Sequence, residues 1–309
     1  MPIDHFNAQK YGRLELRAKQ AVEGFITGMH KSPYHGFSVE FAEHRAYNNG
    51  ESTRHIDWKL YARTDKMFVK RFEEETNLRC QICIDRSGSM FYPKATDEIH
   101  SNKIGFSIQA AASLVYLMRS QRDAVGVTLF GDGIEWSTPA KSNSAHHNYL
   151  FQELEKEFDK KEGASSSNIV SSLHKIAEMV HKRSLIVIFS DFIDSVFIND
   201  ESQTELFEAL QHLRYNKHEV VLFHVYDKKT ELNLDLENRP YTFVDLETGE
   251  QIKVNPNEVR EQYESLRQKK VGDVKLKCRQ FGIDWVETDI SEPVDKVLER
   301  FLAKRARMR

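Results

Sequence analysis

RCQICIDRSGSM, residues 79–90, is the stretch of sequence that decides the fold. Its first half is typical of a short buried strand, and its second half carries one acid and two hydroxyls at alternating positions, Asp85, Ser87 and Ser89. These side chains leave the strand at its carboxyl end, where an open α/β sheet places its binding crevice, and oxygen atoms are the ligands of hard divalent cations. The same pattern is also typical of a strand followed by a turn, in which Asp and Ser only satisfy backbone groups. Taken alone, the stretch leaves both interpretations open.

The bulk composition is that of a soluble globular protein. The chain has 309 residues, of which 40% are hydrophobic and 29% are charged. A formal net charge of -3 gives no reason to expect a nucleic-acid or membrane surface. No apolar run approaches the ~20 residues of a membrane span, and the first residues lack the features of a signal peptide. We therefore expect a cytoplasmic protein without direct membrane insertion, whose three cysteines are reduced.

Strand and helix patterns alternate from residue 79 to the end of the chain. Such alternation predicts an α/β domain over residues 79–309, with a mainly parallel, Rossmann-type sheet and helices on both faces. The apolar run at 184–189 predicts a strand that is covered on both faces. The strands are expected at 81–85, 124–130, 184–189, 220–225 and 284–287, with hairpins at 124–138 and 241–254.

The first 78 residues show a different pattern. Residues 11–30 have a rough apolar helical face, and residues 37–41 and 66–72 alternate as strands do. We expect residues 1–78 to form a helix and a small strand-rich extension of the α/β domain, because the segment is too short to bury a core of its own.

Two further segments bring oxygen ligands to the same edge of the predicted sheet. Asp191 follows the buried run at 184–189, so it leaves its strand at the carboxyl end, as Asp85 does. Ser167 lies in a polar loop that enters the next helix, where a serine can also act simply as a helix cap. Ser165 or Ser166 could take the place of Ser167.

These segments together resemble the metal-ion-dependent adhesion site of von Willebrand factor type A domains. The resemblance implies a von Willebrand factor A-like fold and a bound Mg²⁺, with Mn²⁺ or Ca²⁺ as alternatives, whose open coordination position accepts an Asp or Glu of a protein partner. A serine stands where that site has a threonine, and it retains the oxygen ligand. The implied metal ligands are Asp85, Ser87, Ser89, Ser167 and Asp191.

Residues 45–63, RAYNNGESTRHIDWKLYAR, resemble the signature of the uncharacterised bacterial family DUF58. The resemblance implies a short soluble member of that family, with a MoxR-type AAA+ ATPase as a partner. Arginine pairs well with carboxylates and stacks on aromatic rings, so we interpret the signature as a structural ion-pair network rather than a ligand site. The network would join four charged residues, with two aromatic rings packed against it: Arg45, Arg54, Asp57 and Arg63, with Tyr47 and Trp58.

The sequence therefore predicts a non-enzymatic protein-interaction module that binds a partner's carboxylate through a cation. The alternative is a metal-dependent hydrolase or phosphatase that uses Asp85. Haloacid-dehalogenase-like phosphatases also place an Asp after the first strand, but they need a second carboxylate two residues later, and this chain has Ser87 there. Cys80 and Cys83 form a CxxC within a strand, where residues three apart face opposite sides, so we interpret them as buried core residues.

Overall fold

The computed structural model describes residues 13–26, 38–47, 56–75, 78–94, 102–160, 168–192, 200–244 and 249–307. The chain divides into two compact units, one of residues 1–33 and 79–309 and the other of residues 34–78. The first helix, α2 (Arg13–Ile26), therefore belongs to the α/β unit and not to the predicted extension over residues 1–78. The reason is its apolar face, which includes the buried Leu14 and Val22 and packs on helix α4 (Lys103–Ser120).

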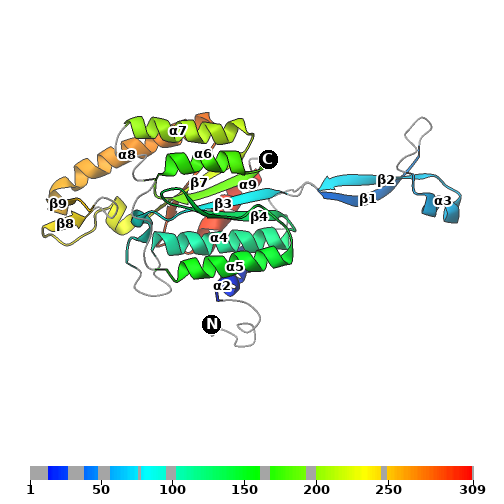
Figure 1. The fold of residues 1–309 in the computed structure, drawn as a ribbon, viewed down its shortest axis with the longest axis horizontal. Coiled ribbons are helices and arrows are strands. Elements are labelled where there is room, and N and C mark those ends of the chain that lie inside the picture. The colour runs from blue at the N-terminus through cyan, green and yellow to red at the C-terminus, as the bar shows by residue number, and fades with distance from the viewer. Residues whose placement is uncertain are drawn as a thin grey trace. The chain divides into compact units, whose positions relative to one another are not determined.

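A six-stranded sheet forms the centre of the α/β unit (Figure 1). Neighbouring strands pair in parallel except at one edge, where β5 runs antiparallel to β4 as the predicted hairpin requires. The predicted α/β class with a mainly parallel sheet is confirmed. In spatial order the strands are β10 (Asp284–Asp289), β7 (Glu219–Tyr226), β6 (Leu185–Ser190), β3 (Arg79–Asp85), β4 (Ala124–Phe130) and β5 (Ile134–Ser137).

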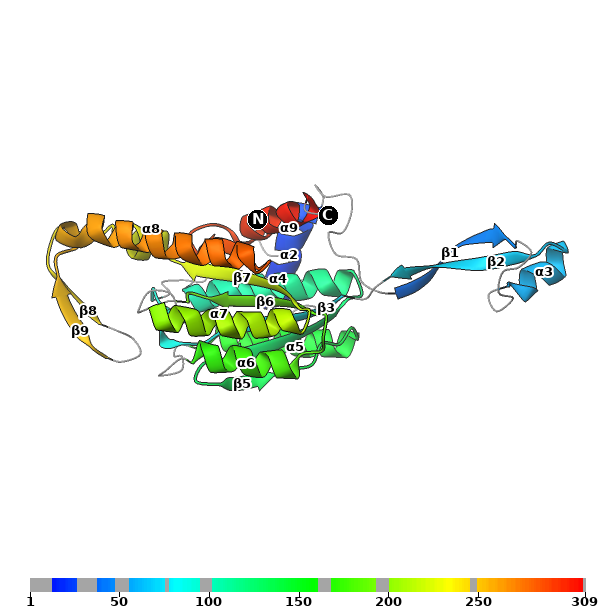
Figure 2. The same cartoon turned by 90° about the horizontal axis from the view of Figure 1, so that it is seen from above.

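Helices cover both faces of this sheet (Figures 1 and 2). One face carries α4, α5 (Ser144–Phe158), α9 (Val294–Arg307) and α2, and the other carries α6 (Ile169–Met179), α7 (Asp200–Tyr215) and α8 (Pro256–Gln280). Helix α4 is buried along most of its length because it lies between the sheet and three other helices. Its small residues 110–112, all alanine, allow these neighbours to approach closely.

Strand β3 lies in the middle of the sheet, with β4 on one side and β6 on the other. Its side chains from Cys80 to Asp85 are all buried, because neighbouring strands and helices enclose them. Cys80 and Cys83 are fully buried, and burial raises the pKa of the Cys80 thiol to about 12. Both are therefore unreactive core residues, as predicted for this CxxC.

The smaller unit contains an antiparallel pair of strands, β1 (Ser38–Ala46) and β2 (Phe68–Glu75), and a short helix, α3 (Trp58–Thr64). Asp57 caps α3, because its Oδ1 accepts hydrogen bonds from the backbone N–H of Lys59 and Leu60 at 3.0 and 3.1 Å. Trp58 is 58% exposed and touches Tyr61 edge-on, which differs from the predicted packing against an ion-pair network.

The rest of that network remains a prediction. Arg54 lies outside the described residues, and the structure describes the backbone of Arg45 but not its side chain. Tyr47 is half-buried and Arg63 is exposed.

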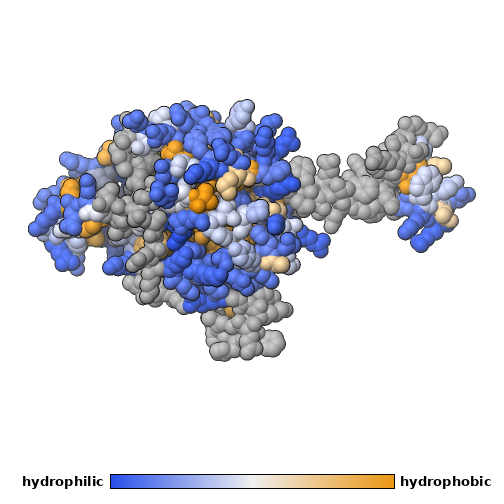
Figure 3. Space-filling view, in the orientation of Figure 1, coloured by the Kyte–Doolittle hydropathy of each residue, from blue (hydrophilic) through white to orange (hydrophobic). Residues whose placement is uncertain are grey.

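The last part of the chain contains a π-helical turn, η4 (Lys228–Leu232), and a hairpin of β8 (Tyr241–Val244) and β9 (Gln251–Val254). This antiparallel pair confirms the predicted hairpin. In the described part of the chain, no helix combines the length and apolar character needed to cross a membrane. On the face seen in Figure 3, the described side chains are mostly hydrophilic and the apolar ones gather in small patches.

Candidate cation site at the carboxyl edge of the sheet

Asp85 and Asp191 come together because β3 and β6 are parallel neighbours. The pairing of Ile84 with Phe189 places the ends of both strands at one edge of the sheet. Asp85 is 2% exposed, and its two oxygens accept hydrogen bonds from Ser87 N–H (2.9 Å) and Ser190 Oγ (2.6 Å). The Ser190 contact links the end of β6 directly to the Asp85 carboxylate.

Two hydroxyls complete the described part of the candidate site. A short 3-10 turn, η2 (Gly88–Phe91), follows β3 and brings Ser87 Oγ and Ser89 Oγ within 3.0 Å of each other. Ser87 is buried and Ser89 is half-buried. The third predicted hydroxyl, Ser167, lies outside the described residues, as do its alternatives Ser165 and Ser166. Asn168, which follows them, caps α6 by accepting from Ser171 N–H at 3.0 Å.

The electrostatics of this edge favour a bound cation. Burial and the neighbouring charge of Asp191 raise the pKa of Asp85 to about 7, although hydrogen bonds from Ser190 and Ser87 oppose the shift. A cation between the two carboxylates would relieve both effects, because it would compensate the buried charges.

The chemistry of the donors fits a hard divalent cation. Among the described residues there is no group of three or more His, Cys, Asp or Glu side chains arranged to hold a metal. A cation at this edge would therefore depend on two carboxylates and neutral serine hydroxyls. That all-oxygen donor set suits Mg²⁺, Mn²⁺ or Ca²⁺.

A buried lysine, which the sequence pattern did not reveal, lies beside these carboxylates. Lys103 is fully buried at the start of α4, and its Nζ donates to Asp191 Oδ2 (2.7 Å) and to Glu231 Oε1 (2.6 Å). Burial alone would lower the pKa of Lys103, but the charges of Asp191 and Glu231 raise it above its ordinary value. The only indication of this residue in the sequence is that a charged lysine precedes apolar residues at the start of a predicted helix.

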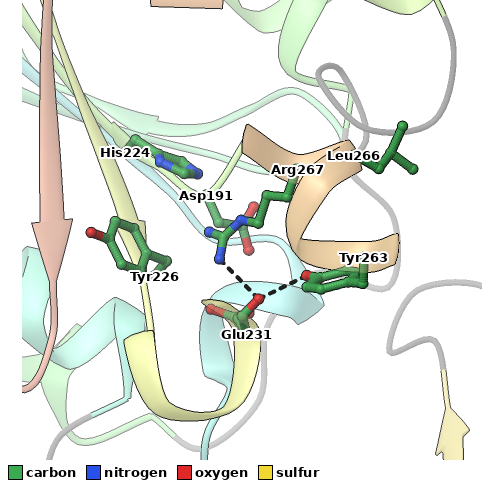
Figure 4. Close-up of a pocket in the computed structure, with 7 residues that line it drawn as sticks. All are labelled: Asp191, His224, Tyr226, Glu231, Tyr263, Leu266 and Arg267. Atoms are coloured by element: carbon green, nitrogen blue, oxygen red, sulfur yellow. Dashed lines mark hydrogen bonds between the residues drawn. The ribbon is translucent and has the colours of Figure 1, made fainter. Parts of the chain in front are cut away.

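Glu231 connects the site to a pocket of about 280 Å³ between β7, η4 and α8 (Figure 4). Its backbone carbonyl accepts hydrogen bonds from Arg267 Nη1 and Tyr263 Oη, each at 2.8 Å. Burial lowers the pKa of His224 to about 3, so this ring is neutral at ordinary pH. The pocket is lined by Asp191, His224, Tyr226, Glu231, Tyr263, Leu266 and Arg267.

Arg86 is a second residue whose role the sequence did not reveal. It stands between Asp85 and Ser87 and is 9% exposed. Its guanidinium pairs with Glu135 of β5 and with Glu157 of α5, the latter at 2.9 Å. These ion pairs fasten the carboxyl end of β3 to two other elements.

Comparison with protein families gives a match over most of the chain. The model described as "Protein of unknown function DUF58" matches residues 43–272. A similar protein from Mycobacterium tuberculosis strain H37Rv, described as "Uncharacterized protein Rv1480", is 24% identical over 183 residues. That alignment covers 59% of this chain and 56% of the relative, so the chain spans little more than half the length of the curated relatives it matches.

Two solved structures are similar at low sequence identity. BatB from Bacteroides thetaiotaomicron is 15% identical, with a TM-score of 0.41, and the match covers 74% of this chain and 99% of that one. An aerotolerance-related membrane protein from Bacteroides fragilis is 14% identical, with a TM-score of 0.40, over 75% of this chain and 100% of that one.

Proposed function

We propose that this chain, which belongs to the DUF58 family, is a protein-interaction module of the von Willebrand factor A type that binds a partner's carboxylate through a divalent cation. One observation carries the proposal: two buried carboxylates, Asp85 and Asp191, meet beside the hydroxyls of Ser87 and Ser89 at one edge of the sheet. Ser167 is proposed as a further ligand on the strength of the motif resemblance.

The residues of the site would share the work of holding the cation. Asp85 is fixed by two hydrogen bonds and would provide negative charge, while the two serine hydroxyls would provide neutral oxygens. A bound Mg²⁺ would supply an open coordination position for the Asp or Glu of a partner. Because the hydroxyls are neutral, the site retains affinity for that additional carboxylate. We propose a MoxR-type AAA+ ATPase as the partner, with the family resemblance as the support.

The alternative of a phosphatase has less support. Ser87 stands where such an enzyme needs its second carboxylate, and a hydroxyl cannot act as an acid or base near neutral pH. Lys103 is engaged with two carboxylates, Asp191 and Glu231. A phosphatase assay with a generic substrate and Mg²⁺ separates the two proposals, since turnover that disappears in Asp85→Asn would favour the enzyme.

The first prediction concerns Asp85. Asp85→Ala should abolish Mg²⁺-dependent capture of a partner from native lysate, because the cation loses a buried carboxylate. The measurement is an affinity pull-down in Mg²⁺ or in excess chelator, followed by mass spectrometry, with circular dichroism to verify the fold. Asp273→Asn, which removes an exposed acid on α8, is the matched control and should capture normally. Equal capture by wild type and Asp85→Ala, with and without chelator, would show that the proposal is wrong.

A further inference from the structure

Lys103 brings a fixed positive charge to the candidate cation site. A buried ammonium is stable only when it is paired and hydrogen-bonded, and Lys103 meets this requirement through Asp191 and Glu231. Its ammonium therefore donates a hydrogen bond to Oδ2, one of the two carboxylate oxygens of Asp191. A divalent cation at this edge would share the Asp191 carboxylate with Lys103.

The surroundings of Glu231 hold this arrangement in place. Its Oε2 accepts from Asp227 N–H at 2.8 Å, and its backbone carbonyl accepts from two side chains of α8, Tyr263 and Arg267 (Figure 4). The ring of Tyr92 lies 5.9 Å from the Lys103 ammonium. Because Glu231 is anchored at three points, the ammonium cannot move far without losing a partner.

We propose that Lys103 sets the affinity of the cation site, so that a divalent cation is held firmly only together with a partner's carboxylate. This inference rests on the proposed function of the site. Lys103 neutralises Asp191 in part and would repel a second positive charge at the same carboxylate, and both effects weaken the binding of a cation alone. The carboxylate of a partner restores the missing negative charge, so cation and partner bind cooperatively.

Glu231 controls how much of this effect reaches Asp191. The Lys103 ammonium divides its hydrogen bonds between the two carboxylates, which lie on different elements. Removing the charge of Glu231 leaves Asp191 as the only carboxylate of this pair to balance the ammonium, whereas removing Lys103 takes a positive charge and its hydrogen bond away from Asp191. The two substitutions should therefore change cation affinity in opposite directions. A purely structural role of this pair would not produce that result.

The test measures Mn²⁺ binding to the purified full chain by electron paramagnetic resonance. Lys103→Met should bind Mn²⁺ at least about tenfold more tightly than wild type, and Glu231→Gln should bind it more weakly. Lys103→Met leaves two carboxylates without a counterion, so the single variant can be unstable. The double variant Lys103→Met/Glu231→Gln removes one charge of each sign, and it should also bind Mn²⁺ more tightly than wild type.

The Mg²⁺ dependence of partner capture provides a second measurement beside the Mn²⁺ binding constants. The Mg²⁺ concentration needed for half-maximal partner capture should fall in the folded Lys103 variants and rise in Glu231→Gln. Unchanged or weaker Mn²⁺ binding in both Lys103 variants, or tighter binding in Glu231→Gln, would overturn the inference. If Asp85→Ala binds Mn²⁺ as well as wild type does, the proposed site itself is wrong, so the two failures are distinguishable.

Discussion

Arg86 shows how a residue between two candidate ligands can stabilise the site without binding anything. Its backbone N–H donates to the carbonyl of Phe130 on β4 at 2.7 Å, and its guanidinium pairs with Glu135 and Glu157. The side chains of Arg86 and Glu157 are 10% and 12% exposed, so these two charges are largely removed from water. Arg86 therefore fixes the position at which Asp85 and Ser87 leave the strand.

We expect Arg86→Met to lower the free energy of unfolding by about 2 kcal/mol, because it removes a buried cation that pairs with both Glu135 and Glu157. Lys160→Ala is the matched control, since Lys160 pairs with the same Glu157 but is 49% exposed. Lys160→Ala should lower the free energy of unfolding by less than about 0.5 kcal/mol. Urea unfolding followed by circular dichroism measures both, and similar losses in the two variants would contradict the assigned role of Arg86.

At the residue scale, the sequence indicated candidate ligands that lie close to strand ends, and it did not indicate the charged groups that lie beside them. Asp85 and Asp191 are predicted because each lies at the end of an apolar run, and Ser87 because it follows Asp85 at an alternating position. Lys103 and Glu231 contact each other across 128 residues of sequence, and no local pattern encodes such a contact. The position of Ser167 remains a prediction from the motif alone.

At the scale of single elements, Gly126 in β4 allows a close approach between strand and loop. A Cβ at this position would lie 2.5 Å from the backbone oxygen of Thr138, 2.6 Å from Gln81 Oε1 and 2.9 Å from the backbone N of Ala140. Gln81 is itself buried and donates to Thr128 Oγ1 at 2.9 Å and to the Thr138 carbonyl at 3.1 Å. The glycine thus makes room for a polar network beside β3.

Gly126→Ala should therefore destabilise the protein by about 3 kcal/mol, because backbone atoms would have to move to admit the methyl group. Gly272→Ala in α8 is the control, since a Cβ there would meet no atom within 4 Å. It should stabilise the protein by up to about 1 kcal/mol through better helix propensity. Thermal unfolding measures the stability of both variants. An unchanged stability of Gly126→Ala would contradict the close contact between β4 and the backbone of residues 138–140.

The elements themselves were largely predictable from local patterns. The uninterrupted apolar run at β6 indicated a strand covered on both faces, and all six residues of β6 are buried. The assignment of α2 to the extension was wrong, because an amphipathic helix does not reveal which distant surface its apolar face covers. Its contacts with α4 and α9 lie far away in the sequence.

At the scale of the whole molecule, buried histidines link stability to pH. His147 on α5 is 1% exposed, and both of its ring nitrogens lack a hydrogen-bond partner in the part of the chain that the structure describes. Burial, together with the nearby His146 and Arg119, lowers the pKa of His147 to about 4 from its ordinary value of 6.5. The folded state therefore binds a proton at this site less readily than the unfolded state does.

Titration of His147 should leave the free energy of unfolding unchanged above pH 6.5 and should lower it as the pH falls toward about 4. His147→Leu removes the titrating group and should reduce the pH dependence of the unfolding free energy in that interval. Urea unfolding at pH 7, 5.5 and 4.5 measures the change. Parallel pH profiles for wild type and His147→Leu would rule out the contribution of His147.

The position of helix α2 in the chain has a consequence for folding during synthesis. Its apolar face packs on α4 and on α9, and α9 comes from the other end of the described chain. On the ribosome, α2 emerges before these partners, and nearly the entire α/β unit, including the inserted residues 34–78, is synthesised before α9 appears. Contacts between such distant parts of a chain slow folding. Nascent chains that stop before α9 should therefore leave the part of α2 that packs on α9 exposed to chaperones.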